Sequence, residues 1–172
     1  MFWKLRVFWY RTDKAALAFG LFCAGIVGAL VFAMTGVFEH RDAQAARLRD
    51  FHARSLDCLA LNVYYEARGE PMAGQYAVAE VTMNRKASRF YPKTVCEVVY
   101  QREAFSWTGT RNLEKPDGEA WAQAQKVAED VYYGRRPASM PGVLHFHATY
   151  VRPDWSAERK RVAKIGRHVF YR

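Results

Sequence analysis

The sequence predicts an α+β protein, with a mainly helical domain that ends in a small β-sheet and follows one N-terminal transmembrane helix. Three observations support this fold class. Residues 15–38 contain no charged side chain. Apolar residues recur at helical spacing over much of residues 56–133, whereas residues 143–148 and 168–171 have the pattern of short strands. Helices followed by a small sheet are typical of α+β domains. The 172 residues leave room for one domain of ordinary size.

The uncharged run at residues 15–38 is long enough to cross a bilayer as a helix. Four basic residues precede it: Lys4, Arg6, Arg11 and Lys14. The positive-inside rule therefore places residues 1–14 in the cytoplasm and the rest of the chain outside. We predict a single-pass protein of the inner (cytoplasmic) membrane with a polar juxtamembrane tether at 39–54 and a domain at 55–172 in the periplasm or cell wall.

A cleavable signal peptide is the alternative, with Ala43-Gln44-Ala45 as the processing site. The apolar run is longer than an ordinary signal-peptide core, and charged residues at 39–42 separate it from that site. The uncleaved anchor is the favoured interpretation. Gly25 and Gly28 lack the spacing of the glycine dimer motif, so the sequence predicts no oligomeric state.

Four helices are expected in the domain. The first covers 56–67, with Ser55 as its cap, and Gly69 and Pro71 end it. The second covers 72–86, next to Glu70, whose side chain is expected to cap it. Thr94 and Glu97 fit a capping box that opens a short helix to residue 101. The fourth covers 119–133. Residues 102–118 between the last two are expected to form a polar loop.

Of the three cysteines, Cys23 lies in the predicted membrane segment. Cys58 and Cys96 lie in the exported part, where disulfides persist. A Cys58–Cys96 disulfide is the favoured interpretation, and two buried thiols are the alternative.

Glu66 occupies the last turn of the first domain helix, between aromatic and apolar neighbours. The negative end of the helix dipole and desolvation both disfavour a charged carboxyl. A carboxyl that stays protonated near neutral pH is suited to general acid catalysis.

Several motifs resemble the spore cortex-lytic enzyme family of cell wall hydrolases. They are Tyr65-Glu66-Ala67-Arg68-Gly69-Glu70-Pro71, Gly74-Gln75, Asn84-Arg85, Phe90-Tyr91-Pro92, Val95-Cys96-Glu97, Phe105-Ser106 and Ile165-Gly166-Arg167-His168-Val169-Phe170-Tyr171. The resemblance implies a lysozyme-like fold and cleavage of the MurNAc–GlcNAc β-1,4 bond of peptidoglycan, with Glu66 as the catalytic acid.

The reaction's outcome stays open at this stage. A lytic transglycosylase needs one acid, whereas a hydrolase of the usual kind needs a second carboxylate. No downstream Asp or Glu stands at a distinctive spacing, which favours a transglycosylase over a muramidase. The alternative to an enzyme is a non-catalytic peptidoglycan-binding or cell-envelope assembly protein that uses the same fold.

Six residues are candidates for substrate binding, because aromatic rings stack on sugars and polar groups bind hydroxyl and N-acetyl groups: Tyr65, Gln75, Ser106, Trp107, His147 and Tyr150. His145 and His147 share a strand face, but no third ligand stands at metal spacing, so no metal and no cofactor are implied. The net charge of +9 favours an anionic partner. Without a nucleic-acid motif, the expected partners are peptidoglycan glycan strands and the membrane.

Overall fold

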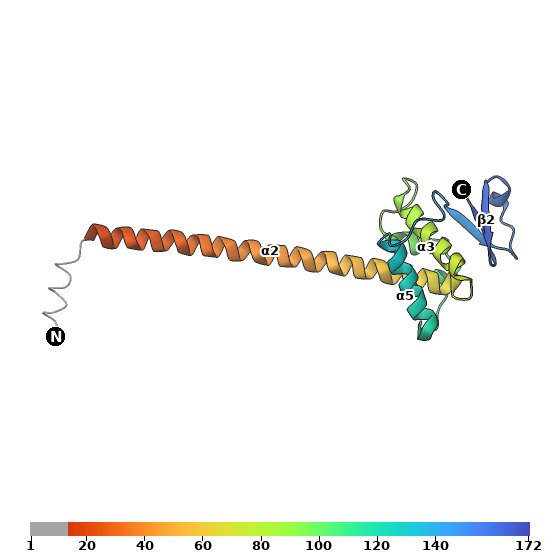
Figure 1. Cartoon of the computed structure of the whole chain (residues 1–172), viewed down its shortest axis with the longest axis horizontal. Helices are drawn as coiled ribbons and strands as arrows, with labels where there is room; N and C mark the ends of the chain where they lie inside the picture. The colour runs from red at the N-terminus through yellow and green to blue at the C-terminus, as the bar shows by residue number, and fades with distance from the viewer. Residues whose placement is uncertain (1–13) are drawn as a thin grey trace. The chain divides into compact units, whose positions relative to one another are not determined.

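The computed structural model describes residues 14–172, with two compact units at Met1–Arg49 and Asp50–Arg172. The expected cytoplasmic segment, apart from Lys14, lies outside the described residues. Figure 1 gives the labels of the main elements.

The described part of the first unit is helical. It belongs to helix α2, which the structure assigns to Lys14–Ala67. Its apolar side chains are exposed, as at Phe19, Leu21 and Phe32. By length and composition, this is a helix that could cross a membrane, and a signal sequence would have the same properties. The expected tether at 39–54 is helical throughout, consistent with its content of Ala, Arg, Leu and Gln, which favour helices.

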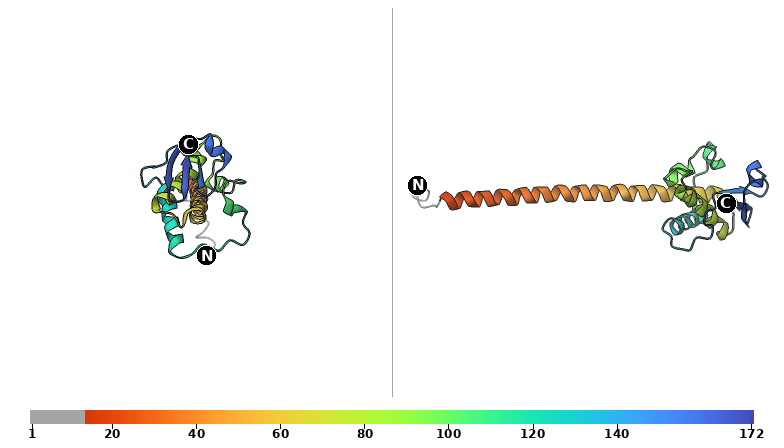
Figure 2. Two further views of the ribbon diagram at one scale, coloured as in Figure 1. Left: turned by 90° about the vertical axis from the view of Figure 1, so that its right-hand side faces the viewer. Right: turned by 90° about the horizontal axis from the view of Figure 1, so that it is seen from above.

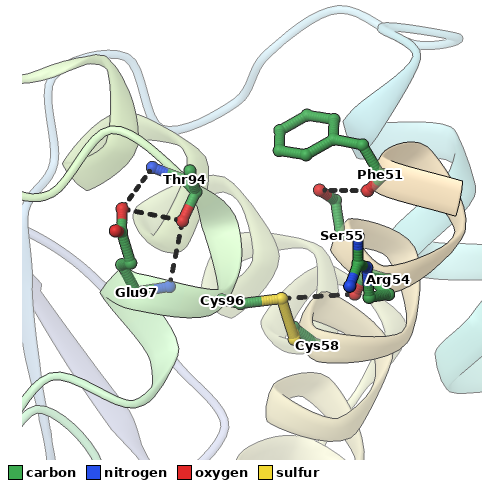
Figure 3. The surroundings of a disulfide bond; sticks show 7 residues. All are labelled: Phe51, Arg54, Ser55, Cys58, Thr94, Cys96 and Glu97. Atoms are coloured by element: carbon green, nitrogen blue, oxygen red, sulfur yellow. Dashed lines mark hydrogen bonds between the residues drawn. A yellow bond between two sulfur atoms is a disulfide. The ribbon is translucent and has the colours of Figure 1, made fainter. Parts of the chain in front are cut away.

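The predicted cap at Ser55 is wrong. Helix α2 continues through this residue, so the amides of the next turn already bond to carbonyls within the helix and none is free for capping. The Ser55 hydroxyl instead donates to the carbonyl oxygen of Phe51, at 2.8 Å (Figure 3).

Helix α3 (Met72–Ala87) is the centre of the second unit, because it has a buried side toward the helices and another toward the sheet. Ala79 belongs to a core that α3 shares with α2, α4 (Val95–Val99) and α5 (Gly118–Tyr132). Ala77, Val78 and Val81 belong to a second core with Phe170. A 3-10 turn, η1 (Ser106–Gly109), lies in the loop before α5. The predicted second, third and fourth helices are confirmed, with ends shifted by one or two residues. The first ends at Ala67 as predicted, but its predicted start at residue 56 is wrong because α2 runs unbroken from Lys14.

The sheet contains three antiparallel strands in the order β1-β3-β2, seen together in Figure 2. Their bounds are His145–Ala148 for β1, Arg161–Ile165 for β2 and His168–Tyr171 for β3. A 3-10 turn, η2 (Asp154–Ala157), precedes β2. The prediction located β1 and β3 but missed β2. This edge strand is largely exposed and mixes charged with apolar residues, so it lacks the apolar run that marks a buried strand.

Cys58 of α2 and Cys96 of α4 form a disulfide, with their Cα atoms 5.3 Å apart (Figure 3). The predicted capping box holds the start of α4: the Thr94 hydroxyl accepts from the Glu97 amide, and the Glu97 carboxylate accepts from the Thr94 amide. The disulfide joins residues 38 positions apart in the sequence and ties the short helix α4 to the long helix α2.

We expect the disulfide to stabilise the second unit. The double substitution Cys58→Ser/Cys96→Ser should lower the free energy of unfolding by about 2–5 kcal/mol, the usual cost in a small exported domain. Denaturant unfolding of the full-length chain in detergent, followed by tryptophan fluorescence, measures this difference. Cys23→Ser is the matched control because Cys23 is a free cysteine of the first unit. Equal stability of the double variant and the parent would contradict the expectation.

Candidate active site

A cleft of about 430 Å³ lies at the end of α2. Its walls come from α2, from the loop before η1 and the first residue of η1, from β1 and the turn after it, and from the start of β3. The lining residues are Tyr65, Glu66, Ala104, Phe105, Ser106, Phe146, His147, Ala148, Tyr150, Val151 and His168. Within the described part of the chain, Glu66 is the only carboxylic acid in this lining. A smaller cavity of about 210 Å³ between α2 and α5 has no aromatic lining residue.

The Glu66 carboxyl is held in a partly desolvated position in the last turn of α2. Burial raises its pKa from an ordinary 4.5 to about 7, while the positive charge of Arg85 acts in the opposite direction. Among the residues described, Glu66 forms no ion pair within 4.0 Å. The sequence predicted a raised pKa from desolvation and the helix dipole, and desolvation is the dominant cause here.

Arg85 is a buried, fixed cation beneath the cleft. Its Nε donates to the carbonyl oxygen of Leu144 at 2.8 Å. Its guanidinium carbon lies 5.1 Å from the ring centroid of Phe105 and 5.5 Å from that of Tyr91. These contacts hold the charge away from direct pairing with Glu66, so Arg85 moderates the rise in pKa without removing it.

Polar side chains of α3 fix the chain that leads into β1. The Glu80 carboxylate accepts from the backbone amides of Ser139 and Met140, at 2.8 and 2.6 Å. The Asn84 amide donates to the carbonyl oxygens of Met140 and Val143, at 2.6 and 3.0 Å. The Asn84-Arg85 pair of the sequence thus has a structural role, since it positions the strand that carries Phe146 and His147.

Glu70 fixes the start of β3. Its carboxylate accepts from the backbone amide and from Nε of Arg167, both at 2.8 Å. Burial alone would raise the pKa of Glu70, but these two hydrogen bonds outweigh it and lower the pKa. Gly166 is required beside this pair: a Cβ atom there would overlap the Glu70 carboxylate, and its φ of +54° favours glycine.

The predicted cap by Glu70 is therefore wrong. Pro71 is the N-cap residue of α3, and no side-chain hydrogen bond caps this helix. The carboxylate turns instead toward Arg167, a partner 97 residues away in the sequence. The short distance in sequence between Glu70 and the start of α3 could not reveal that Arg167 would bind the carboxylate instead.

Four of the six predicted substrate-binding residues line the cleft: Tyr65, Ser106, His147 and Tyr150. Tyr150 is largely open to solvent, with 84% of its surface exposed. Gln75 and Trp107 are buried and do not line it. The Gln75 amide donates to the backbone carbonyl of Glu70 at 3.0 Å. The Trp107 indole donates to the side chain of Asn62 at 3.0 Å and stacks behind Tyr65, with ring centroids 4.8 Å apart.

Two histidines border the cleft in different states. His147 Nδ1 lies 2.9 Å from the carbonyl oxygen of Ala148, which only accepts, so Nδ1 carries the proton. Nε2 then accepts from the Tyr171 hydroxyl at 2.9 Å. His168 was not among the residues predicted from the sequence. It is buried, and its Nδ1 has no partner within the described residues. Burial lowers the pKa of His168, so it is neutral near pH 7.

The sequence and the fold both match known proteins. The sequence matches the cell wall hydrolase family over residues 69–171, more than half of the chain. The chain therefore belongs to this family, as the sequence motifs predicted. The matched region begins at Gly69, so Glu66 stands just before it.

The relatives are spore cortex-lytic enzymes. The chain is 32% identical over 135 residues to that of Bacillus subtilis strain 168, covering 76% of this chain and 42% of the relative. Its identity to that of Oceanobacillus iheyensis is 31% over 124 residues, covering 70% and 42% of the two chains. The chain thus spans less than half the length of these relatives.

Solved catalytic domains show the same fold. The structure resembles the catalytic domain of the Bacillus cereus SleB protein, with a TM-score of 0.58 and 30% identity, over 69% of this chain and 89% of that one. It resembles the catalytic domain of the germination-specific lytic transglycosylase SleB of Bacillus anthracis equally, with a TM-score of 0.58 and 30% identity, covering 69% and 93% of the two chains. The mainly helical fold with a small antiparallel sheet is thereby confirmed.

Burial of Glu66 should make the stability of the second unit depend on pH. Below pH 4.5 the carboxyl is protonated in both the folded and unfolded states, so it has no effect. Between pH 4.5 and about 7 only the unfolded chain loses the proton, and folding stability falls as the pH rises. Glu66→Gln removes this penalty, so its stability gain should be absent at pH 4 and roughly 3 kcal/mol at pH 8.

Denaturant unfolding of both full-length chains at pH 4 and pH 8 measures the effect. Glu119→Gln, at an exposed carboxyl in the first turn of α5, controls for the loss of an acid outside the cleft. A Glu66→Gln chain that is less stable than the parent at pH 8 would rule out the desolvated carboxyl.

Proposed function

We propose that the protein cleaves the MurNAc–GlcNAc β-1,4 bond of peptidoglycan, as a lytic transglycosylase with Glu66 as its general acid. The observation that carries this proposal is a lone carboxyl, with a pKa of about 7, in an open cleft. Burial lets such a group keep its proton to higher pH than an ordinary carboxyl does, which suits the transfer of a proton to a leaving oxygen. Membership of the cell wall hydrolase family supports the substrate class.

The mechanism needs one acid that also serves as a base. Glu66 gives its proton to the glycosidic oxygen as the bond from that oxygen to C1 of MurNAc breaks. The C6 hydroxyl oxygen of the same MurNAc then attacks C1, and its proton returns to the Glu66 carboxylate. The products are a 1,6-anhydro end and a new GlcNAc hydroxyl, and Glu66 is restored. The lack of a second carboxyl in the described lining favours this route over hydrolysis by water.

The other lining residues would bind the glycan. Tyr65 and Tyr150 offer aromatic faces for sugar rings, and the Tyr65 hydroxyl is fixed by donation to the carbonyl oxygen of Glu114 at 2.6 Å. Ser106 is exposed and can bind hydroxyl or N-acetyl groups. His147 is held by hydrogen bonds at both ring nitrogens, so it would act as a rigid wall rather than as a proton donor.

We also propose that residues 15–38 anchor the protein in the inner membrane, with the domain at 55–172 in the periplasm or cell wall. The exposed apolar surface of α2 over these residues supports a lipid environment, since soluble proteins rarely leave so many large apolar side chains in water.

Glu66→Gln should abolish most of the activity. The amide keeps the shape of the side chain but has no proton to give, so the rate should fall by about 10²–10⁴-fold. Release of soluble muropeptides from purified sacculi by the full-length chain in detergent measures the rate. Mass analysis should find 1,6-anhydro ends in the wild-type products.

Glu70→Gln is the matched control, and it should affect stability rather than activity. It weakens a buried hydrogen-bonded contact, so it should lower the melting temperature and leave most of the activity of the folded protein. Full activity in Glu66→Gln would refute the proposal. Reducing ends in place of anhydro ends would assign the muramidase reaction, and binding without cleavage by the wild type would assign a non-catalytic binding protein.

The anchor has its own test. A C-terminal fusion to alkaline phosphatase, which is active only outside the cytoplasm, should be active and remain in the membrane fraction. Adding two arginines after residue 38 and replacing Lys4 and Arg6 by Asn is the control, because it reverses the charge bias. An active, soluble and shortened product would show cleavage of a signal peptide.

A further inference from the structure

The net charge of the second unit is concentrated at its C-terminal end. Residues 50–149 hold twelve basic and twelve acidic side chains, so this part is balanced. Residues 150–172 hold seven basic and only two acidic side chains. The whole positive excess of the unit therefore lies in η2, β2, β3 and the chain around them.

Five of these basic side chains form what we call the basic face: Arg152, Arg159, Lys160, Arg161 and Lys164. All five are exposed. In the described part of the chain, none of them forms an ion pair within 4.0 Å. Arg167 is excluded because Glu70 binds it. Five cations without acidic partners repel one another, so the basic face attracts external anions.

Strand pairing places part of the basic face on the same sheet face as His147, while Phe146, Ala148 and His168 line the cleft from the opposite face. Ile165 packs into the core beside Phe170, so alternate residues of β2 point to the opposite side. Lys164 pairs with Val169 of β3, and His147 of β1 pairs with the same residue. Lys164 and His147 therefore share a sheet face, and His147 lines the cleft.

The other end of the basic face joins the cleft directly. Arg152 follows Tyr150 and Val151, which both line the cleft. The Arg159 guanidinium lies over the ring of Trp155, at 5.9 Å from its centroid. Trp155 in turn contacts His147, with ring centroids 5.7 Å apart. A polymer bound in the cleft would thus have its substituents beside these cations.

We propose that the basic face binds the carboxylates of the stem peptides carried by the glycan strand in the cleft. This inference rests on the proposed function. The amino sugars of the strand are uncharged, and the lactyl group of MurNAc carries the peptide whose free carboxylates supply the negative charge. The acid at Glu66 acts beside a MurNAc residue, so a peptide of the bound strand leaves the cleft close to the cleaved bond. The basic face then selects peptide-bearing strands.

Charged residues on an edge strand can also serve only to prevent pairing with other chains. A charge reversal separates the two roles, because glutamate keeps the edge charged but repels carboxylates. Arg161→Glu/Lys164→Glu is the test variant. Arg89→Glu/Lys93→Glu is the matched control: both residues are exposed, and the change in net charge is the same.

Co-sedimentation with insoluble sacculi, freed of other attached polymers, measures binding. Each variant is made in the full-length Glu66→Gln chain, so that the sacculi stay intact. We expect the test variant to bind about tenfold more weakly, because two exposed charge contacts become repulsions. The control variant should bind like the parent. Amidation of the carboxylates with carbodiimide and methylamine should weaken parent binding to the same extent, as should raised salt.

Either of two results with sacculi would overturn the inference: equal binding of test variant and parent, or parent binding that survives amidation. If the test variant lost binding to vesicles with anionic lipid but kept its binding to sacculi, the basic face would be assigned to the membrane. That result would also overturn the inference. Muropeptide release by the wild-type chain tests the proposed function separately. If the protein bound carboxylates but released no muropeptides, the role of the basic face would stand and the proposed enzymatic activity would be rejected.

Discussion

Hydrogen bonds from polar side chains of α3, and of the turn before it, to the C-terminal part of the chain hold the cleft together. The strands are four or five residues long, and so small a sheet needs support from other elements. Glu80 and Asn84 bind main-chain groups at 139–143, and Glu70 binds the main chain and side chain of Arg167. Most of these partners are backbone groups, so the fit depends more on the path of the captured segment than on its side chains.

The carboxyl group in the cleft and the one that supports the sheet differ in the direction of their pKa shifts. Glu70 and Glu66 stand four residues apart, yet one has a lowered pKa and the other a raised pKa. The difference arises from partners: Glu70 receives two hydrogen bonds from Arg167, whereas Arg85 is held away from Glu66 by Leu144 and two aromatic rings. Natural proteins accept such local costs in stability where a function needs an unpaired acid.

The sequence predicted those features that depend on local pattern. Helix periodicity, the capping box at Thr94 and the position of Glu66 at a helix end can all be recognised within a few residues. The Cys58–Cys96 pairing followed from compartment and from having only two candidates. The Glu70 cap was misjudged because its partner is Arg167, which only the folded chain reveals. Gln75 and Trp107 lie outside the cleft lining, bound to a backbone carbonyl and to Asn62, and these partners are also invisible in the sequence. Strand β2 was missed because an exposed edge has no apolar signature, and His168 because the pattern of β3 does not tell which face meets the cleft.

The position of the disulfide on α2 has a mechanical consequence. Cys58 precedes Glu66 by about two helical turns, roughly 12 Å along the axis. Any tension that enters α2 from its N-terminal end reaches Cys58 first. There the disulfide passes part of the load to α4 before it arrives at the turn that carries Glu66. The last part of the helix can therefore keep its rotational phase while the chain ahead of it is pulled, twisted or displaced.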